Sequence, residues 1–306
     1  MNQPKSQHWV PRFYLRHFAT QDTRGTDHPK VWIFSSEEGD GDETLTSVRN
    51  VCAKRYLYSP RSDTRARSWD LERKLASIED ALAGLWPRLA NESVDLGDLT
   101  VRRGVSLFVA LMHLRNPQSL ELVESVHRRL VAHYEQMPRK LDGSPDVDSV
   151  EIGGEVTPFD TADWHAYRTW GKDDHHRFFA HLIESEAIGL AELLMLKRWS
   201  VIYTEHDTLI TSDKPVALQH RTRAVFGFQT PGAIVSFPIS PKRLLVMDDV
   251  RNEPANQYYP LDVSARGAFN HNIWHNGSRF MITGRPVPEV LAEMVGWAES
   301  FAERHA

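Results

Sequence analysis

The chain has 306 residues, of which 41% are apolar, 10% aromatic and 25% charged. These fractions are close to those of globular proteins, which argues against a disordered, collagen-like or coiled-coil chain. Thirty-six basic and 41 acidic residues give a formal net charge of −5. This charge argues against a protein that coats nucleic acid with its whole surface.

The N-terminal sequence and the cysteine content bear on the cellular compartment. Residues 1–13 (MNQPKSQHWVPRF) contain no apolar stretch typical of a signal peptide. The longest apolar stretch, residues 105–112, is far shorter than the roughly 20 residues of a membrane-spanning helix. The single cysteine, Cys52, rules out an internal disulfide and a structural zinc site with several thiolates. We therefore expect a cytoplasmic protein without membrane partners.

The first predicted elements are two short strands and a long amphipathic helix. Residues 31–34 (VWIF) and 44–48 (TLTSV) flank an acidic segment at 37–43 that is typical of an exposed hairpin loop. From Trp69 onward the apolar residues alternate by four and three, which predicts one buried stripe along a helix that ends at about Ala90. The stripe consists of Leu71, Leu75, Ile78, Leu82, Leu85 and Leu89.

Two further helices and a long loop are predicted in the middle of the chain. One helix is expected to begin at about 98–100 and to be kinked or ended by Pro117, because proline lacks the amide N–H and crowds the preceding turn. A third helix follows over 118–137. Residues 139–160 are rich in Gly, Pro and Asp, so we expect a long loop or internal boundary there, followed by a helix over 173–197.

The last third is predicted to be rich in short strands, mostly antiparallel because their links are short. A helix over 262–275 and a closing helix over 288–301 complete the chain. Helices therefore cluster in the middle and strands at both ends. We expect a single α+β domain over residues 1–306, with a mixed, mainly antiparallel sheet and a central group of helices. The strands expected in this part are 199–204, 208–212, 224–228, 233–240, 243–248 and 279–283.

The sequence contains none of five common catalytic or nucleotide-binding motifs. Gly-x-Gly-x-x-Gly, the phosphate-binding loop ending in Gly-Lys-Ser/Thr, His-Glu-x-x-His, Gly-x-Ser-x-Gly and Cys-x-x-Cys are all absent. Together these absences count against the common nucleotide-binding, zinc-protease, esterase and thiol-redox classes.

His8 is the first candidate functional residue. It lies in QHWVPRFYLRHF, among large apolar residues, where desolvation lowers the pKa of an imidazole and favours general-base chemistry near neutral pH. A core histidine that hydrogen-bonds a carbonyl explains the same pattern. On the residues alone, the core histidine is the favoured interpretation.

Residues 211–216 (TSDKPV) form the second candidate. Ser212 and Asp213 follow the apolar run of a predicted strand, and Pro215 ends that strand. Catalytic carboxylates are common at strand ends, because the strand fixes a group that the loop exposes. A turn in which these side chains satisfy their own backbone is an equal alternative.

Arg115 is the third candidate, at the end of an apolar helical stretch and just before a proline. Its guanidinium can cap the last carbonyls of that helix. It can also hold a phosphate or carboxylate through two hydrogen bonds. Without further context, capping is the favoured interpretation.

Residues 49–67 form a basic segment with aromatic neighbours. Six basic residues and one acid give it a charge of +5, which leaves −10 for the rest of the chain. Basic groups interleaved with aromatic rings suit a phosphate backbone and stacked bases, so nucleic acid or a nucleotide is a candidate partner. A solvated basic face paired with the acidic segment 37–43 explains the charges equally well. The basic residues are Arg49, Lys54, Arg55, Arg61, Arg65 and Arg67.

His271 and His275 are four residues apart in a predicted helix, a spacing found in pairs of metal ligands. No carboxylate completes the set locally, although Asp262 or Asp213 could do so in space. Some pair with this spacing is expected among 15 histidines, and a chance pair is the favoured interpretation.

The order of several segments resembles the domain-of-unknown-function 4238 family, a large and mainly bacterial family with an N-terminal His-x-x-Pro motif. The resemblance runs from His8 to about Thr283, and the opening motif together with the Thr-Ser-Asp-x-Pro-Val motif is fairly specific. The matching segments are QHWVPRFYLRHF, NVCAKRYLYS, LERKLASIEDAL, LFVALMHLRNP, TLITSDKPV, FPISPKRLL, and FN followed by GSRFMIT.

The resemblance implies no activity, but it does imply which residues share a pattern. The family often has a glutamine where this chain has Met112, so any ligand contact made by that amide is missing here. His271 and His275 lie outside the pattern, which weakens the hypothesis of a metal site. The shared polar residues and prolines are His8, Pro11, Glu79, Arg115, Ser212, Asp213, Pro215 and Asn270.

The first functional hypothesis is a hydrolase or nuclease that acts on a phosphate-bearing or nucleic-acid substrate. His8 would be the general base or acid, and Asp213, with Glu79, would orient it or hold a divalent metal such as Mg²⁺ or Mn²⁺. Arg115 would stabilise developing negative charge. The kind of family suggests a toxin or phage-defence effector. The substrate-binding residues would be Ser212, Asn270, Arg49 and Arg55.

The second hypothesis is a non-catalytic sensor or interaction protein in which the same residues form a buried network, with His8 bonded to Asp213. An open cleft around His8, Arg115 and Asp213 favours the enzyme, whereas burial beneath Trp and Phe favours the network. We expect the enzyme, because a polar cluster on a mixed scaffold is more often a site than a structural network.

Overall fold

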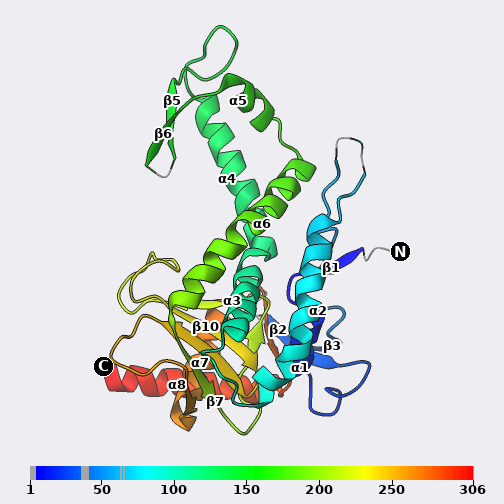
Figure 1. The fold of residues 1–306 in the computed structure, drawn as a ribbon, viewed down its shortest axis with the longest axis vertical. Helices are drawn as coiled ribbons and strands as arrows, with labels where there is room; N and C mark the ends of the chain where they lie inside the picture. Colours follow the sequence, from blue (N-terminus) through cyan, green and yellow to red (C-terminus); the bar gives the residue numbers. More distant parts are fainter. Residues whose placement is uncertain (1–4, 36–40, 63, 65, 153, 306) are drawn as a thin grey trace.

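A computed structural model describes residues 5–35, 41–62, 64, 66–152 and 154–305. The fold is α+β, as predicted, with a five-stranded sheet, a four-stranded sheet and a group of long helices. Both sheets lie at one end of the molecule, and the long helices from the middle of the chain extend away from them (Figure 1).

The five-stranded sheet has the strand order β12-β7-β11-β10-β9. Its pairs are antiparallel except for β12, which runs parallel to β7, so the sheet is mixed as expected. The prediction of a strand at 224–228 is wrong, because these residues form bends and turns. The edge of β10 that faces away from β11 is already paired with β9. The strands are β7 (Arg198–Tyr203), β9 (Ala217–Gln219), β10 (Ile234–Ser240), β11 (Arg243–Asp248) and β12 (Gln257–Pro260).

The four-stranded sheet has the order β3-β2-β13-β8 and joins the two ends of the chain. The antiparallel pairing of β2 with β3 confirms the predicted hairpin, although residues 36–40 of its acidic loop lie outside the described residues. Ser212, on the short strand β8, pairs with Met281 on β13. The strands are β2 (Lys30–Ser35), β3 (Asp42–Ser47), β8 (Thr211–Ser212) and β13 (Met281–Thr283).

The central helices follow the periodicity and the capping residues of the sequence. The predicted stripe lies on α2 (Asp70–Asn91), where Leu71, Leu75, Leu82 and Leu89 are buried. The side chain of Asp98 accepts two amide hydrogen bonds and so caps α3 (Leu99–Leu114). Pro117 does not kink α3, because α3 ends before it. Instead this proline is the first residue of α4 (Pro117–Glu135), a position that needs no amide donor.

Helix α4 and helix α6 (Lys172–Leu196) carry a projecting part of the molecule at their far end (Figure 1). The expected long loop at 139–160 contains a hairpin of β5 (Ser149–Ile152) and β6 (Glu155–Pro158), followed by α5 (Thr161–Tyr167). At the C-terminal end, η1 (Val263–Ala265) and α7 (Arg266–His275) replace the single helix expected over 262–275, and α8 (Val287–His305) closes the described chain.

The core forms where α1 (Arg12–His17), α2, α3 and β10 meet. Its centre is a cluster of aromatic rings with edge-to-face and stacked contacts, and these rings are almost fully buried. The Tyr14 hydroxyl donates to the Pro238 carbonyl at 2.7 Å and also bonds Thr211. This pairing satisfies the polar end of an otherwise apolar side chain. The rings belong to Tyr14, Phe18, Trp86, Phe108 and Phe237.

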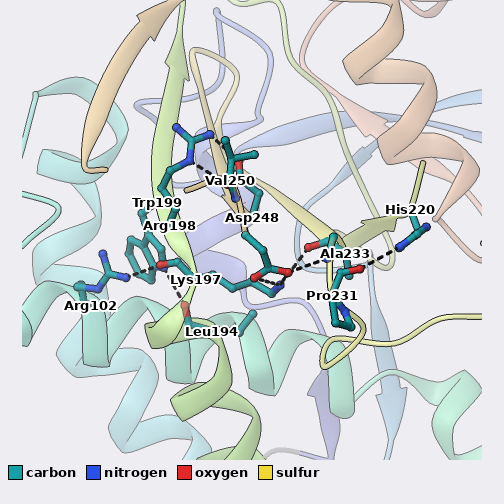
Figure 2. A network of polar contacts seen from close by, with 12 residues as sticks. Arg102, Leu194, Lys197, Arg198, Trp199, His220, Pro231, Ala233, Asp248 and Val250 are labelled. Atoms are coloured by element: carbon teal, nitrogen blue, oxygen red, sulfur yellow. Dashed lines mark hydrogen bonds and ion pairs between the residues drawn. The ribbon is translucent and has the colours of Figure 1, made fainter. Parts of the chain in front are cut away.

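A polar network joins the end of α6 to the five-stranded sheet (Figure 2). The Lys197 ammonium donates to the Ala233 carbonyl and to both carboxylate oxygens of Asp249, each at 3.0 Å. Arg198 pairs with Asp248 through two hydrogen bonds of 2.8 and 2.6 Å. Because each cation has its own carboxylate, this network fixes α6 on the sheet and leaves no unpaired cation among these four side chains.

Candidate functional site

The N-terminal segment that carries His8 is held in place by buried polar contacts. Strand β1 (Ser6–His8) pairs with β4 (Ala53–Arg55). The fully buried Gln7 amide donates to Ser59 Oγ at 2.7 Å and accepts from the Tyr58 amide at 2.7 Å. These contacts fix the backbone on both sides of the His8 side chain.

His8 lies half-buried beside a cleft of about 350 Å³ between this segment and α2. Its Nε2 is 3.2 Å from the Arg49 carbonyl, so this nitrogen donates and Nδ1 carries the lone pair. Burial lowers the pKa of His8, and the positive charges of Arg12 and Arg115 lower it further. The imidazole is therefore neutral at neutral pH and able to accept a proton.

Helix α2 supplies three carboxyl groups to the lining of the cleft, at Glu72, Glu79 and the exposed Asp80. Burial raises the pKa of Glu72 to about 7, and the neighbouring charge of Glu79 contributes to the rise. Glu79 Oε1 accepts from Arg115 at 2.6 Å, so Glu79 has a cationic partner. One carboxyl group is thus poised to be protonated near neutral pH beside another that is ion-paired.

Arg115 holds the two walls of the cleft together. Its side chain is 1% exposed and donates to the Trp9 carbonyl at 2.8 Å as well as to Glu79. A third donor lies 3.6 Å from the sulfur of Met112. Arg115 therefore joins the segment next to His8 to α2, which is a positioning role rather than the simple helix cap that the sequence favoured.

Three guanidinium groups lie close together at α1 and the neighbouring turn. Burial lowers the pKa of Arg12, and so do the charges of Arg49 and Arg16. Within the ranges that the structure describes, no carboxylate forms an ion pair with any of the three. Arg12 lines the cleft itself. Arg55 is exposed on β4, 5.7 Å from the Tyr56 ring.

Asp213 belongs to a separate, sealed network. Its carboxylate accepts from the Ser278 amide at 2.9 Å, from the Ser278 hydroxyl, and from the Arg279 amide at 3.2 and 3.1 Å. Its backbone carbonyl accepts from the Trp9 indole at 2.8 Å and from Asn116 at 3.0 Å. The predicted contact between His8 and Asp213 is not found among the described residues.

Ser212 and Asn270 are also fully buried and serve the backbone. The Ser212 hydroxyl accepts from the Lys214 amide at 3.2 Å, which forms the turn that the sequence allowed. The Asn270 side chain accepts from the Ile210 amide at 3.1 Å and donates to the Thr208 carbonyl at 3.0 Å. These side chains hold α7 against the segment before β8 and do not line the cleft of His8.

The structure therefore divides the predicted site residues into two groups. His8 and Glu79 line one cleft, and the buried Arg115 joins its walls. The Asp213 carboxylate does not reach that cleft, although Trp9 bonds both Arg115 and the Asp213 carbonyl. Sequence reasoning missed Glu72 and Arg12. The signal for Glu72 was its place beside the apolar stripe, seven residues before Glu79 and thus on the same face of α2.

Within the described ranges, no three His, Cys, Asp or Glu side chains are grouped closely enough to hold a metal ion. The residues expected to hold Mg²⁺ or Mn²⁺ do not form such a group, because Asp213 bonds backbone amides and Glu79 bonds Arg115. No helix in the described ranges combines the length and apolar character that crossing a bilayer requires.

Comparison with known proteins places the chain in a family but does not reveal an activity. No curated protein and no solved structure matches the chain. One family model, described as a protein of unknown function (DUF4238), matches residues 6–285, which include the His8 cleft and the Asp213 network. The chain therefore belongs to the DUF4238 family.

Proposed function

We propose that the protein is a hydrolase, that its acid–base site is the cleft beside His8, and that its substrate carries a phosphate group. The observation that carries the proposal is the convergence of a neutral imidazole, a carboxyl group with a pKa of about 7 and the guanidinium of Arg12 at one cleft. Such opposed shifts mark candidate acid–base pairs.

In the proposed reaction, His8 Nδ1 accepts a proton from a water molecule as the water oxygen bonds to phosphorus. The bond from phosphorus to the leaving oxygen breaks, and protonated Glu72 donates its proton to that oxygen. Arg12 and Arg49 offset the negative charge of the phosphate. A proton passes from His8 back to Glu72 through solvent and completes the cycle. Arg115 and Glu79 position the two walls.

The test compares the wild type with His8→Ala and Glu72→Gln. Each purified protein is assayed on single-stranded DNA, RNA, nucleotides and simple phosphate esters. His28→Ala and Glu92→Gln are matched controls, because both positions are exposed and outside the cleft. We expect the two cleft variants to lose activity without a fall in melting temperature and both controls to retain it. Absence of hydrolysis by the wild type on every class contradicts the proposal.

The assays also extend the proposal to its biological setting. Hydrolysis of nucleic acid, rather than of small phosphate esters alone, would make the protein a nuclease. If expression of the wild type arrests cell growth and expression of Glu72→Gln does not, the activity is that of a toxin or phage-defence effector. Unimpaired growth with both proteins argues against that role. It does not test the hydrolase proposal, which the enzymatic assay tests separately.

The sealed network favours a second candidate, a non-catalytic sensor or interaction protein. Asp213, Ser212 and Asn270 are buried and use their polar atoms on the protein itself. If the pattern shared by the family is mainly structural, Asp213→Ala lowers the melting temperature strongly in a protein that hydrolyses none of the substrates. That combined result would favour this candidate over the hydrolase.

A further inference from the structure

A second cleft, of about 330 Å³, lies beside the C-terminal end of α7. His271 and His275 both line it, together with Trp274 and Arg279. The two histidines are exposed, and no hydrogen bond within the described part of the chain uses either imidazole. The cleft thus contains two adjacent imidazole rings whose nitrogens are free to bind a ligand.

The two rings lie close to the separation that a shared metal ion requires. They are parallel within 7°, and their centroids are 5.9 Å apart. With metal–nitrogen bonds of about 2.0–2.1 Å, two neighbouring imidazoles on one ion have centroids roughly 4.5–5.2 Å apart, so the rings must approach by about 1 Å. Rotation about χ2, which is a soft torsion in histidine, turns one nitrogen of each ring toward the same point.

We propose that His271 and His275 form a two-nitrogen site for a divalent transition metal of the Zn²⁺, Ni²⁺ or Cu²⁺ class, with water in the remaining coordination positions. Imidazole suits these ions, whereas Mg²⁺ and Mn²⁺ prefer oxygen ligands. This site is distinct from the oxygen-ligand site expected from the sequence, and it does not depend on the proposed hydrolase.

The charges around the pair permit a cation. His275 is the last residue of α7, so the negative end of the helix dipole lies on this side of the cleft. Arg279 is the cationic side chain of the cleft, and Glu121 pairs with it at 3.0 Å.

The test titrates untagged, chelator-treated full-length protein with Cu²⁺, Ni²⁺, Zn²⁺ and Mg²⁺ by calorimetry at pH 7.5. We expect one ion per chain, with Cu²⁺ bound most tightly and Mg²⁺ not bound. Loss of even an outer partner of a metal ligand costs about 10- to 100-fold in affinity, so His271→Ala and His275→Ala should each weaken binding by at least roughly tenfold. His181→Ala, an exposed histidine on α6, is the matched control.

Fluorescence gives a second measurement at the site. Trp274 lines the cleft, and the Trp297 ring is 5.4 Å from the His271 ring. Cu²⁺ should therefore quench emission in the wild type and in His181→Ala but not in His271→Ala. Equal Cu²⁺ affinity in the wild type and His271→Ala overturns the proposal, as does saturable Mg²⁺ binding that competes with Ni²⁺. Circular dichroism verifies that each variant is folded.

Discussion

Substitution of Asp213 by alanine separates a structural role from a catalytic one. The carboxylate is 1% exposed and accepts hydrogen bonds from three donors, namely the Ser278 amide, the Ser278 hydroxyl and the Arg279 amide. Alanine removes every acceptor at once. It leaves the backbone carbonyl bonds to Trp9 and Asn116 in place, because these do not involve the side chain.

The magnitude follows from the three donors that lose their partner. A buried donor left unsatisfied costs about 1–3 kcal/mol, and breaking a buried charged interaction costs about 3–5 kcal/mol. Ser278 is half-buried and Arg279 exposed, so water can reach part of the freed turn. We therefore expect Asp213→Ala to lower the free energy of unfolding by about 3–4 kcal/mol, near the lower end of the summed cost of three unsatisfied donors.

Urea denaturation followed by tryptophan fluorescence measures this change, and Asp213→Asn refines it. The asparagine retains one acceptor oxygen, so we expect a smaller loss of stability than with alanine. Asp146→Ala, an exposed carboxylate in the projecting part of the molecule, is the control and should leave stability nearly unchanged. Unaltered stability of Asp213→Ala together with loss of hydrolysis would refute the structural interpretation and return Asp213 to the catalytic site.

Three further predictions concern the cleft, the core and a helix contact. Because the pKa of Glu72 is raised to about 7 in the folded protein, its contribution to stability is present below about pH 4.5 and is lost as the pH rises through about 7. Glu72→Gln should flatten this part of the curve of unfolding free energy against pH. An unchanged curve contradicts the raised pKa of Glu72. Tyr14→Phe removes the hydrogen bond to the Pro238 carbonyl and should cost about 1–2 kcal/mol in denaturant unfolding; a neutral effect would show that this hydroxyl does not stabilise the fold. At Gly267 an added Cβ would lie 2.4 Å from the Glu293 carbonyl oxygen. Gly267→Ala should therefore push α7 away from α8 and lower the free energy of unfolding by about 1–3 kcal/mol. The control Gly189→Ala, with nothing within 4 Å of the added Cβ, should be neutral or stabilising.

Much of the secondary structure was predictable because it is encoded by neighbours along the chain. The leucine stripe of α2 and the caps at Asp98 and Asn116 depend on residues within one or two helical turns. The wrong predictions also rest on local sequence patterns, but contacts with distant segments determine the observed structure. Residues 224–228 have strand-forming side chains, yet the edge of β10 that could pair with them is already taken by β9. The hairpin at 149–158 was hidden by a composition typical of loops.

The candidate site was predictable only in part, for the same reason. The sequence alone placed Ser212 and Asp213 correctly at the end of a strand, and it marked His8 and Arg115 as unusual. It could not show which side chains Asp213 would meet, because Ser278 and Arg279 lie 65 and 66 positions away. Nor could it show that Arg115 would join the segment of His8 to α2 and so bring Glu72 into the same cleft. Periodicity fixes the face on which a side chain lies, whereas the packing of distant segments decides which polar groups meet and how far their pKa values shift.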